Sequence, residues 1–244
     1  MKYLTKDWYV RTLTVFFIRD LIPCSERDAT DAEFLRKMNF LNYEAFVRNE
    51  LRVGRADEEL TAKIFREKIR YNNAIIKALP DDVIDKSKAK RSLRIGYASP
   101  SVLSALKNYA ASLSAECGKS FEKAKAASRE CLEKNGITDC PSFLYGGHRV
   151  KTLKKEGTRV TLECDGSKAV FTGAEITLKE GIVYSSDENS FLPVSVIAAA
   201  ELREDGDKRE MRLLLESRNK YDKLTLNYLF ISAENIRIIS RSEK

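Results

Sequence analysis

The spacing of apolar residues changes once along the chain, near residue 140. Before this point apolar residues recur every three or four positions, and after it they alternate with polar ones. The first spacing is typical of amphipathic helices and the second of strands with one buried face. We therefore predict an α+β protein. A helical bundle over residues 1–140 should be followed, over residues 141–244, by an antiparallel β meander that forms a small open barrel or a sandwich.

Two tight turns organise the predicted β domain. The alternating run Arg159–Cys164 is followed at once by Asp165-Gly166, and a second turn, Glu-Asp-Gly-Asp, lies at residues 204–207. Asp-Gly favours a hairpin because the tightest turns need positive φ at their central residues. We expect about six to eight strands in this domain. Besides Arg159–Cys164, they cover a segment beginning near residue 148 and residues 169–178, 194–202, 209–215, 224–231 and 236–239.

Capping residues and prolines place the helices. Thr30 and Glu33 form a capping box, in which each side chain can satisfy a free amide at a helix start. A later helix must end before Pro80, and Ser99-Pro100 suits the first turn of another. The helix after the capping box would bury a stripe formed by Phe34, Met38, Leu41 and Ala45. The expected helices cover about residues 1–22, 30–54, 56–79, 99–113 and 121–135.

The first predicted helix competes with a signal peptide as the interpretation of the apolar segment near the start. Lys6, Asp7 and Arg11 interrupt that segment, and no small-residue cleavage site follows it. Its longest apolar run is four residues, far below the roughly 20 needed to span a bilayer. We therefore expect no membrane span, and a buried helix with Leu13 and Phe16 on its apolar face.

Four short segments carry a family resemblance: Met1-Lys-Tyr-Leu-Thr-Lys-Asp-Trp-Tyr9, Leu79-Pro-Asp-Asp-Val-Ile84, Ile95-Gly-Tyr-Ala-Ser99 and Gly147-His-Arg-Val150. Together they resemble a family of uncharacterised bacterial proteins, mostly from Gram-positive species. The resemblance implies a helical front and a β back over most of the chain, and it implies no known activity. Where that family often has aspartate after the histidine, this chain has Arg149, so the resemblance gives the histidine no role.

The composition favours a reducing compartment and no metal. With 244 residues, of which 43% are hydrophobic, the chain is long enough to build a core without covalent staples. Its five cysteines are scattered and odd in number, which disfavours a disulfide framework and is typical of the cytoplasm. Cys131 and Cys140 are too far apart for the usual zinc-ligand spacing, and His148 is the only histidine. We predict free thiols, a cytoplasmic location, and no metal or cofactor.

Positive charge is concentrated in the helical part. The net charge is +7; residues 1–140 contain 26 Lys and Arg against 20 Asp and Glu, whereas residues 141–244 contain 17 and 16. The densest cluster consists of Lys86, Lys88, Lys90, Arg91 and Arg94, with no acid among them. Such a cluster could bind phosphates through Coulomb attraction and counterion release. The other basic residues are interleaved with acids and no RNA-binding signature occurs, so a solvated connection is the preferred interpretation.

The residues needed for common enzyme chemistry are sparse. His148 is the only histidine that could act as a general base, and it follows Gly146-Gly147 at an expected strand start. Alternation points Cys164 into the core, where a thiol should be inert. The acids of segment 201–207 crowd a hairpin tip, where we expect them to be solvated. No glycine-rich phosphate loop of a common type is found. We therefore favour a protein that is not an enzyme and assign no catalytic residue.

Three functional hypotheses remain. The preferred one is a non-enzymatic cytoplasmic protein-binding or regulatory protein, whose partner is another protein or a second copy of itself. It is suggested by the predicted strand 224–231, which is apolar on both faces and must be covered by this chain or by a partner. The second is nucleic-acid binding through segment 86–94. The third is an enzyme with an unrecognised site between the two halves.

Overall fold

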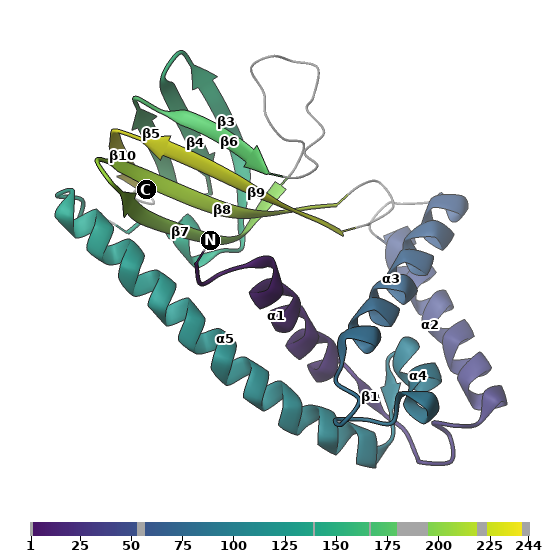
Figure 1. Cartoon of the computed structure of the whole chain (residues 1–244). Helices are drawn as coiled ribbons and strands as arrows, with labels where there is room; N and C mark the ends of the chain where they lie inside the picture. Colours follow the sequence, from purple (N-terminus) through teal and green to yellow (C-terminus); the bar gives the residue numbers. More distant parts are fainter. Residues whose placement is uncertain are drawn as a thin grey trace. The chain divides into compact units, whose positions relative to one another are not determined.

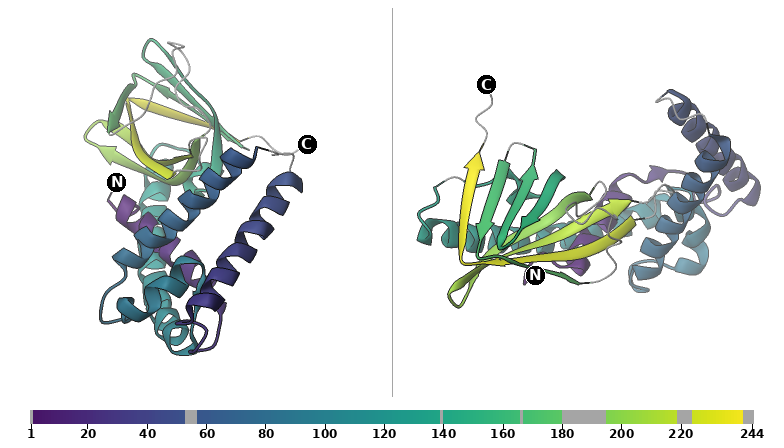
Figure 2. Two further views of the ribbon diagram at one scale, coloured as in Figure 1. Left: turned by 90° about the vertical axis from the view of Figure 1, so that its right-hand side faces the viewer. Right: turned by 90° about the horizontal axis from the view of Figure 1, so that it is seen from above.

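Helices occupy the first part of the chain and antiparallel strands the second in the computed structural model, which confirms the α+β class (Figures 1 and 2). The structure describes residues 2–52, 57–138, 140–165, 167–179, 195–218 and 224–240. Two units divide the chain. The helical unit comprises Val10–Glu116 and Lys220–Lys223, and the sheet unit comprises Met1–Tyr9, Cys117–Asn219 and Leu224–Lys244. They differ from the predicted domains 1–140 and 141–244 because the first and last helices each contribute residues to both units.

The described residues up to Lys134 contain five helices and a short parallel strand pair, and the first and last of these helices extend into the sheet unit. The elements are α1 (Lys6–Arg19), β1 (Ile22–Pro23), α2 (Ala32–Arg52), α3 (Glu58–Ala78), α4 (Lys86–Arg94), β2 (Tyr97–Ala98) and α5 (Pro100–Lys134). The core of the helical unit gathers Ile18, Ile76, Leu93 and Leu106. The buried residues of α2 are only Leu35 and Glu50, so most of this 21-residue helix remains at the surface.

Two predicted apolar faces of helices are only partly buried. In α1 the buried residues are Thr14 and Ile18, whereas Phe16 is 44% exposed, with the Arg19 guanidinium 4.8 Å from its ring centre. In α2 the predicted stripe fails in the same way, because Leu41 is 41% exposed and Leu35 is buried instead. Each helix packs through a narrower face than its apolar content suggests.

The cap of α2 lies one residue later than the predicted capping box. The Oδ1 atom of Asp31 accepts the amides of Glu33 and Phe34 at 2.8 and 3.1 Å, while the Thr30 hydroxyl donates to the Arg27 carbonyl. A carboxylate is the stronger acceptor at a helix start. The hydrogen bonds from Phe34 and Glu33 hold the pKa of Asp31 below its ordinary value. The predicted helix end at residue 54 lies outside the described residues.

One long helix replaces the two predicted over 99–113 and 121–135. Helix α5 begins at Pro100, as the Ser99-Pro100 signal predicts, and runs for 35 residues through Gly118. A single glycine in a helix costs only about 1 kcal/mol, which flanking turns easily offset. The helix ends at Lys134, and the Ile137 amide donates to the Leu132 carbonyl at 2.9 Å across Gly136, whose φ is +69°.

The sheet unit contains one eight-stranded antiparallel sheet. Its strands are β3 (His148–Glu156), β4 (Arg159–Cys164), β5 (Ser167–Thr172), β6 (Glu175–Lys179), β7 (Ser195–Asp205), β8 (Lys208–Arg218), β9 (Leu224–Ala233) and β10 (Asn235–Ser240). Both predicted hairpins are present, joining β4 to β5 and β7 to β8. The strand order is β10-β5-β4-β3-β7-β8-β9-β6, so the sheet departs from a simple meander and is not closed into a barrel.

Two sharp corners explain this strand order. The predicted strand 169–178 is interrupted at Gly173, whose φ is +62°, so β5 pairs with β10 while β6 pairs with β9. The second corner lies at Glu234, between β9 and β10. A β carbon at Gly173 would come within 2.5 Å of the Glu234 side chain, so the two corners are closely packed. As a result, the short strands β6 and β10 form the two edges of the sheet.

A single apolar core fills one face of the sheet. It includes Phe143 from the 3-10 helix Ser142–Tyr145, Phe171, Ile197 and Met211, all fully buried. The chain enters β3 through Gly146, whose φ is +76° and where a β carbon would lie 2.7 Å from the Ala198 carbonyl oxygen. This segment is therefore a tight turn that only glycine fits.

Candidate functional site

The doubly apolar strand that suggested a partner is covered by this chain itself. In β9, Leu229 and Ile231 are fully buried in the main core. On its other face, Leu226 and Tyr228 pack against a second cluster, which we call the sealed face. The sealed face consists of Leu4, Ala124, Ala199 and Leu214, with Tyr3, Trp8, Tyr9, Phe121, Ala198, Leu226 and Tyr228 packed around them. This chain itself therefore covers Leu226 and Tyr228 on the second face of β9.

A buried glutamate fastens the segment that covers the sealed face. Glu201 is 4% exposed, and its carboxylate accepts the backbone amides of Lys2, Tyr3 and Leu4 at 2.8, 2.8 and 2.5 Å. The Lys6 amide donates to the Tyr228 hydroxyl at 2.7 Å. The prediction of a solvated acid is thus wrong for Glu201. It is confirmed for Glu204, Asp205 and Asp207, which are exposed.

The cysteines and the histidine do not form a nucleophilic site. Burial raises the pKa of the Cys164 thiol to about 12 and that of Cys131 to about 11. Both thiols are therefore protonated at neutral pH, and the thiolate that would act as nucleophile is scarce. Cys164 lies opposite Val150 in the β3–β4 register, while His148 lies opposite Ile197 of β7. Among the described residues, no group of three or more His, Cys, Asp or Glu side chains could hold a metal ion.

The five basic residues of segment 86–94 lie on α4, on the part of the helix surface left by the buried Ala89, Ser92 and Leu93. Two of the five are paired with acids: Lys86 with Asp81 at 2.9 Å and Lys88 with Asp85 at 3.5 Å. Lys90 and Arg91 are exposed, and Arg94 lines a groove beside other residues. Among the predicted site residues, Lys86 lines a second hollow at the start of α4, and Arg94 lines the groove.

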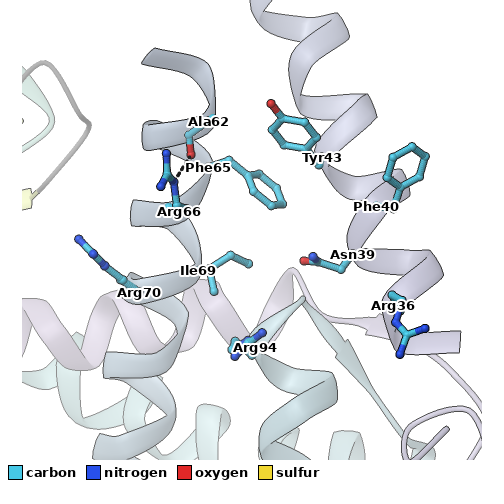
Figure 3. Close-up of a pocket in the computed structure, with 10 residues that line it drawn as sticks. All are labelled: Arg36, Asn39, Phe40, Tyr43, Ala62, Phe65, Arg66, Ile69, Arg70 and Arg94. Atoms are coloured by element: carbon cyan, nitrogen blue, oxygen red, sulfur yellow. Dashed lines mark hydrogen bonds between the residues drawn. The ribbon is translucent and has the colours of Figure 1, made fainter. Parts of the chain in front are cut away.

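That groove lies between α2 and α3 and has a volume of about 640 Å³. Phe65 and Ile69 project from α3 toward Asn39 and Tyr43 on α2, and Arg94 lies below them (Figure 3). Its lining residues are Arg36, Asn39, Phe40 and Tyr43 from α2, Ala62, Phe65, Arg66, Ile69 and Arg70 from α3, and Arg94 from α4. We call this set the arginine groove.

Aromatic rings form the apolar part of the arginine groove. Phe65 is almost fully buried, and its ring packs edge-on against Tyr43, with centroids 5.3 Å apart. Phe46 lies 5.7 Å from the same ring, on the side of α2 that faces α3. Phe40, one turn before Tyr43, is 59% exposed. The groove thus has a packed aromatic floor and an uncovered aromatic side chain beside it.

Two asparagines hold Arg94 at the end of the groove. Asn72 of α3 donates its side-chain amide to the Arg94 carbonyl at 2.9 Å, and Asn42 of α2 donates to the Ile95 carbonyl at 2.9 Å. These carbonyls end α4 and would otherwise lack partners. The asparagines therefore satisfy the end of α4 and fix Arg94 between the two longer helices.

The arginine groove carries more positive than negative charge. None of its ten lining residues is an acid. Arg70 is paired with Glu67 on its own helix, and the Arg66 Nε atom donates to the Ala62 carbonyl at 3.2 Å. Within the described ranges, Arg36, Arg66 and Arg94 form no ion pair with an acid. Three guanidinium groups from three different helices are therefore available to a carboxylate or a phosphate.

Sequence patterns indicated only Arg94 among these residues. Arg36, Phe40 and Tyr43 recur at spacings of four and three, which places them on one face of α2. This stripe could have been found by testing each face of α2 for aromatic and arginine residues together. It was hidden because the neighbouring stripe that contains Leu41 is equally apolar.

Comparison with protein-family models, with curated proteins and with solved structures finds no match to this chain. The resemblance to a bacterial family therefore stays a prediction. Across the described residues, no helix combines the length and the apolar character needed to cross a membrane.

Proposed function

We propose that this chain is a non-enzymatic protein-binding protein, and that the arginine groove holds a segment of its partner. The observation that supports this proposal is the combination of Phe40, 59% exposed, with an apolar groove lined by three arginines that form no ion pair with an acid in the described parts of the chain. Exposed apolar surface of this kind marks interaction sites in soluble proteins. We also propose a cytoplasmic location, because the cysteines are free thiols that a reducing compartment would preserve.

The residue types in the groove favour binding over catalysis. Its lining contains aromatic, aliphatic, amide and guanidinium groups, and no Asp, Glu, His, Cys or Lys. General acid–base chemistry needs a group that exchanges a proton near neutral pH, and arginine does not. Aromatic residues and arginine are, by contrast, the side chains most enriched in the energetic centres of protein interfaces.

The energetics also favour an occupant. Covering an exposed phenylalanine stabilises a complex by about 1.5–3 kcal/mol. A well-formed arginine–carboxylate pair adds about 1.5–3 kcal/mol when water is excluded from it. Arg36, Arg66 and Arg94 line the groove with Phe40 and form no ion pair with an acid among the described residues, so the groove can supply both contributions. The ring of Phe40 points away from α3 and lies at the outer border of the groove (Figure 3).

Site-specific photo-crosslinking tests the proposal. A benzophenone amino acid is placed at Phe40, and the matched control carries it at Phe16, a 44% exposed phenylalanine of α1 that does not line the groove. After irradiation in cells, we expect adducts of discrete mass with position 40 and not with position 16. An adduct of twice the chain mass would identify self-association as the form of binding. No adduct at position 40, or the same adducts at both positions, would contradict the proposal.

A further inference from the structure

Building on the proposed function, we infer that the segment held by the arginine groove is an amphipathic helix with acidic residues beside its apolar stripe. The apolar stripe would lie on Tyr43, Phe65 and Ile69, with Phe40 at its border. The carboxylates would pair with Arg36, Arg66 and Arg94. The partner is thus identified by its chemistry: a helical, negatively charged protein segment.

The shape of the groove suits a third helix. Its walls are two helices of 21 residues each, and residues of the same wall recur one turn apart, as Phe65 and Ile69 do on α3. Such rows form ridges, and a helix with apolar residues at positions i, i+3, i+4 and i+7 can pack its own ridge between them. An extended peptide would instead require a free sheet edge or a row of backbone donors, which neither helix wall provides.

The charge of the groove selects an acidic occupant. Arg36, Arg66 and Arg94 come from three helices and have no acidic partner in the described parts of the chain. Arginine pairs with carboxylate through two parallel hydrogen bonds, so acids flanking the apolar stripe would be held on both sides. The side chain of Asn72 holds the backbone carbonyl of Arg94 at the end of α4.

Local acids make a polynucleotide the poorer candidate. Asp81, Asp82 and Asp85 line a second hollow at the start of α4, and two of them are paired with Lys86 and Lys88. A nucleic acid that followed the basic residues of α4 would bring phosphates close to these carboxylates. A short acidic helix that engages only Arg94 at the groove end avoids them.

Three synthetic peptides of about 18 residues test the charge requirement. All share one apolar stripe at helical spacing, and the flanking positions are Glu in the first, Gln in the second and Lys in the third. Fluorescence anisotropy with the full chain measures their affinities. We expect the Glu peptide to bind at least about tenfold more tightly than the Gln peptide, with affinity falling as NaCl rises, and the Lys peptide not to bind. Equal affinities for the Glu and Gln peptides would overturn the inference.

A matched pair of variants on α4 tests the place of binding. Arg94→Glu reverses a charge in the groove, and Arg91→Glu makes the same change one turn earlier on an exposed residue outside it. For the Glu peptide we expect about tenfold loss with Arg94→Glu and less than about twofold with Arg91→Glu. Circular dichroism checks that both variants fold. Equal losses would show general attraction to α4 and contradict the groove as the site.

The two proposals can fail separately. Crosslinks at position 40 without preference for the Glu peptide would support protein binding and contradict the acidic helix as the occupant. If neither the crosslinks nor the preference for the Glu peptide is observed, both proposals are wrong. A labelled single-stranded oligonucleotide serves as the nucleic-acid probe: if it binds more tightly than the Glu peptide and both Arg91→Glu and Arg94→Glu weaken it equally, the basic segment binds nucleic acid and the inference is wrong.

Discussion

The sealed face and the arginine groove are both apolar surfaces, but only one of them is covered. On the sealed face, residues 2–9 and α5 lie against Leu214 and Tyr228, and Leu214 is fully buried. In the arginine groove, Phe65 is buried between α2 and α3, yet the neighbouring Phe40 is 59% exposed. Apolar content alone therefore does not tell whether a surface needs a partner.

Their polar groups show the difference more sharply. Around the sealed face, the buried carboxylate of Glu201 accepts three amides, and the Tyr228 hydroxyl accepts a fourth. Around the groove, Arg36, Arg66 and Arg94 have no acidic partner among the described residues. A surface that completes itself satisfies its polar groups internally. A surface that binds a partner can instead carry charged groups that are not paired within the chain.

The largest expected effect compares a leucine of the sealed face with an exposed leucine of α2 beside the arginine groove. Leu214→Ala leaves a cavity in the sealed face, and we expect the free energy of unfolding to fall by about 3 kcal/mol. The control is Leu41→Ala on α2, which is 41% exposed and should cost less than about 1 kcal/mol. Urea denaturation followed by circular dichroism measures both. Similar losses would contradict the distinction between a covered and an uncovered surface.

The next effect concerns the carboxylate that fastens residues 2–4. Glu201→Gln keeps the size of the side chain and replaces one acceptor oxygen by a donor, which faces backbone amides. We expect a loss of about 2 kcal/mol, because a buried amide is left without an acceptor. Glu204→Gln, on the exposed hairpin, should change stability by less than about 0.5 kcal/mol.

Thiol labelling shows where the Glu201→Gln variant opens. Cys117 is buried, and its carbonyl accepts the Trp8 indole N–H at 3.0 Å. In a background with Cys24→Ser and Cys140→Ser, the remaining cysteines are all buried. Faster labelling of Cys117 than of Cys164 is expected if residues 2–9 detach locally. Equal rates would mean that the whole sheet unit unfolds instead.

A smaller effect is expected from a single hydroxyl. Tyr228→Phe removes the acceptor of the Lys6 amide and should lower the free energy of unfolding by about 1 kcal/mol. Tyr109→Phe is the control, because Tyr109 packs in the helical unit and its hydroxyl has no partner in the described part of the chain. Thermal denaturation of both variants measures the difference. An unchanged midpoint temperature for Tyr228→Phe would show that this hydrogen bond contributes nothing to stability.

The smallest effect on stability should accompany a large effect on binding. Phe40→Ala removes an exposed ring, so the free energy of unfolding should change by less than about 0.5 kcal/mol. The same change should weaken the Glu peptide by about tenfold or more, because an aromatic anchor is lost. If Phe40→Ala instead unfolds the helical unit, the ring serves packing and the groove is not an open surface.

The local features of the fold could be predicted from the sequence, but the pairings between strands far apart in the sequence could not. Asp165-Gly166 and segment 204–207 specify their hairpins because turn and strands are adjacent in the chain. The pairing of β6 with β9 instead joins residues such as Ile176 and Ile231, which no local pattern connects. The corner at Gly173 escaped for the same reason, since it is defined by its contact with Glu234.

The two surfaces were also hidden by distance along the chain. Glu201 lies close to an acidic hairpin tip in sequence, and only the amides of residues 2–4, almost 200 positions earlier, explain its burial. The arginine groove depends on which face of α2 meets α3, and α2 has more than one apolar stripe. Arg94 was found because it belongs to a basic cluster, two members of which are paired with acids.

The corners at Gly173 and Glu234 have a consequence for solubility. They leave β6 and β10, of five and six residues, as the outer strands of the sheet. Strands this short present few open backbone groups to a neighbouring molecule, and bends beside them spoil the flat template that fibril-like stacking requires. The short edge strands thus disfavour the pairing of this leucine- and isoleucine-rich sheet with strands of other molecules.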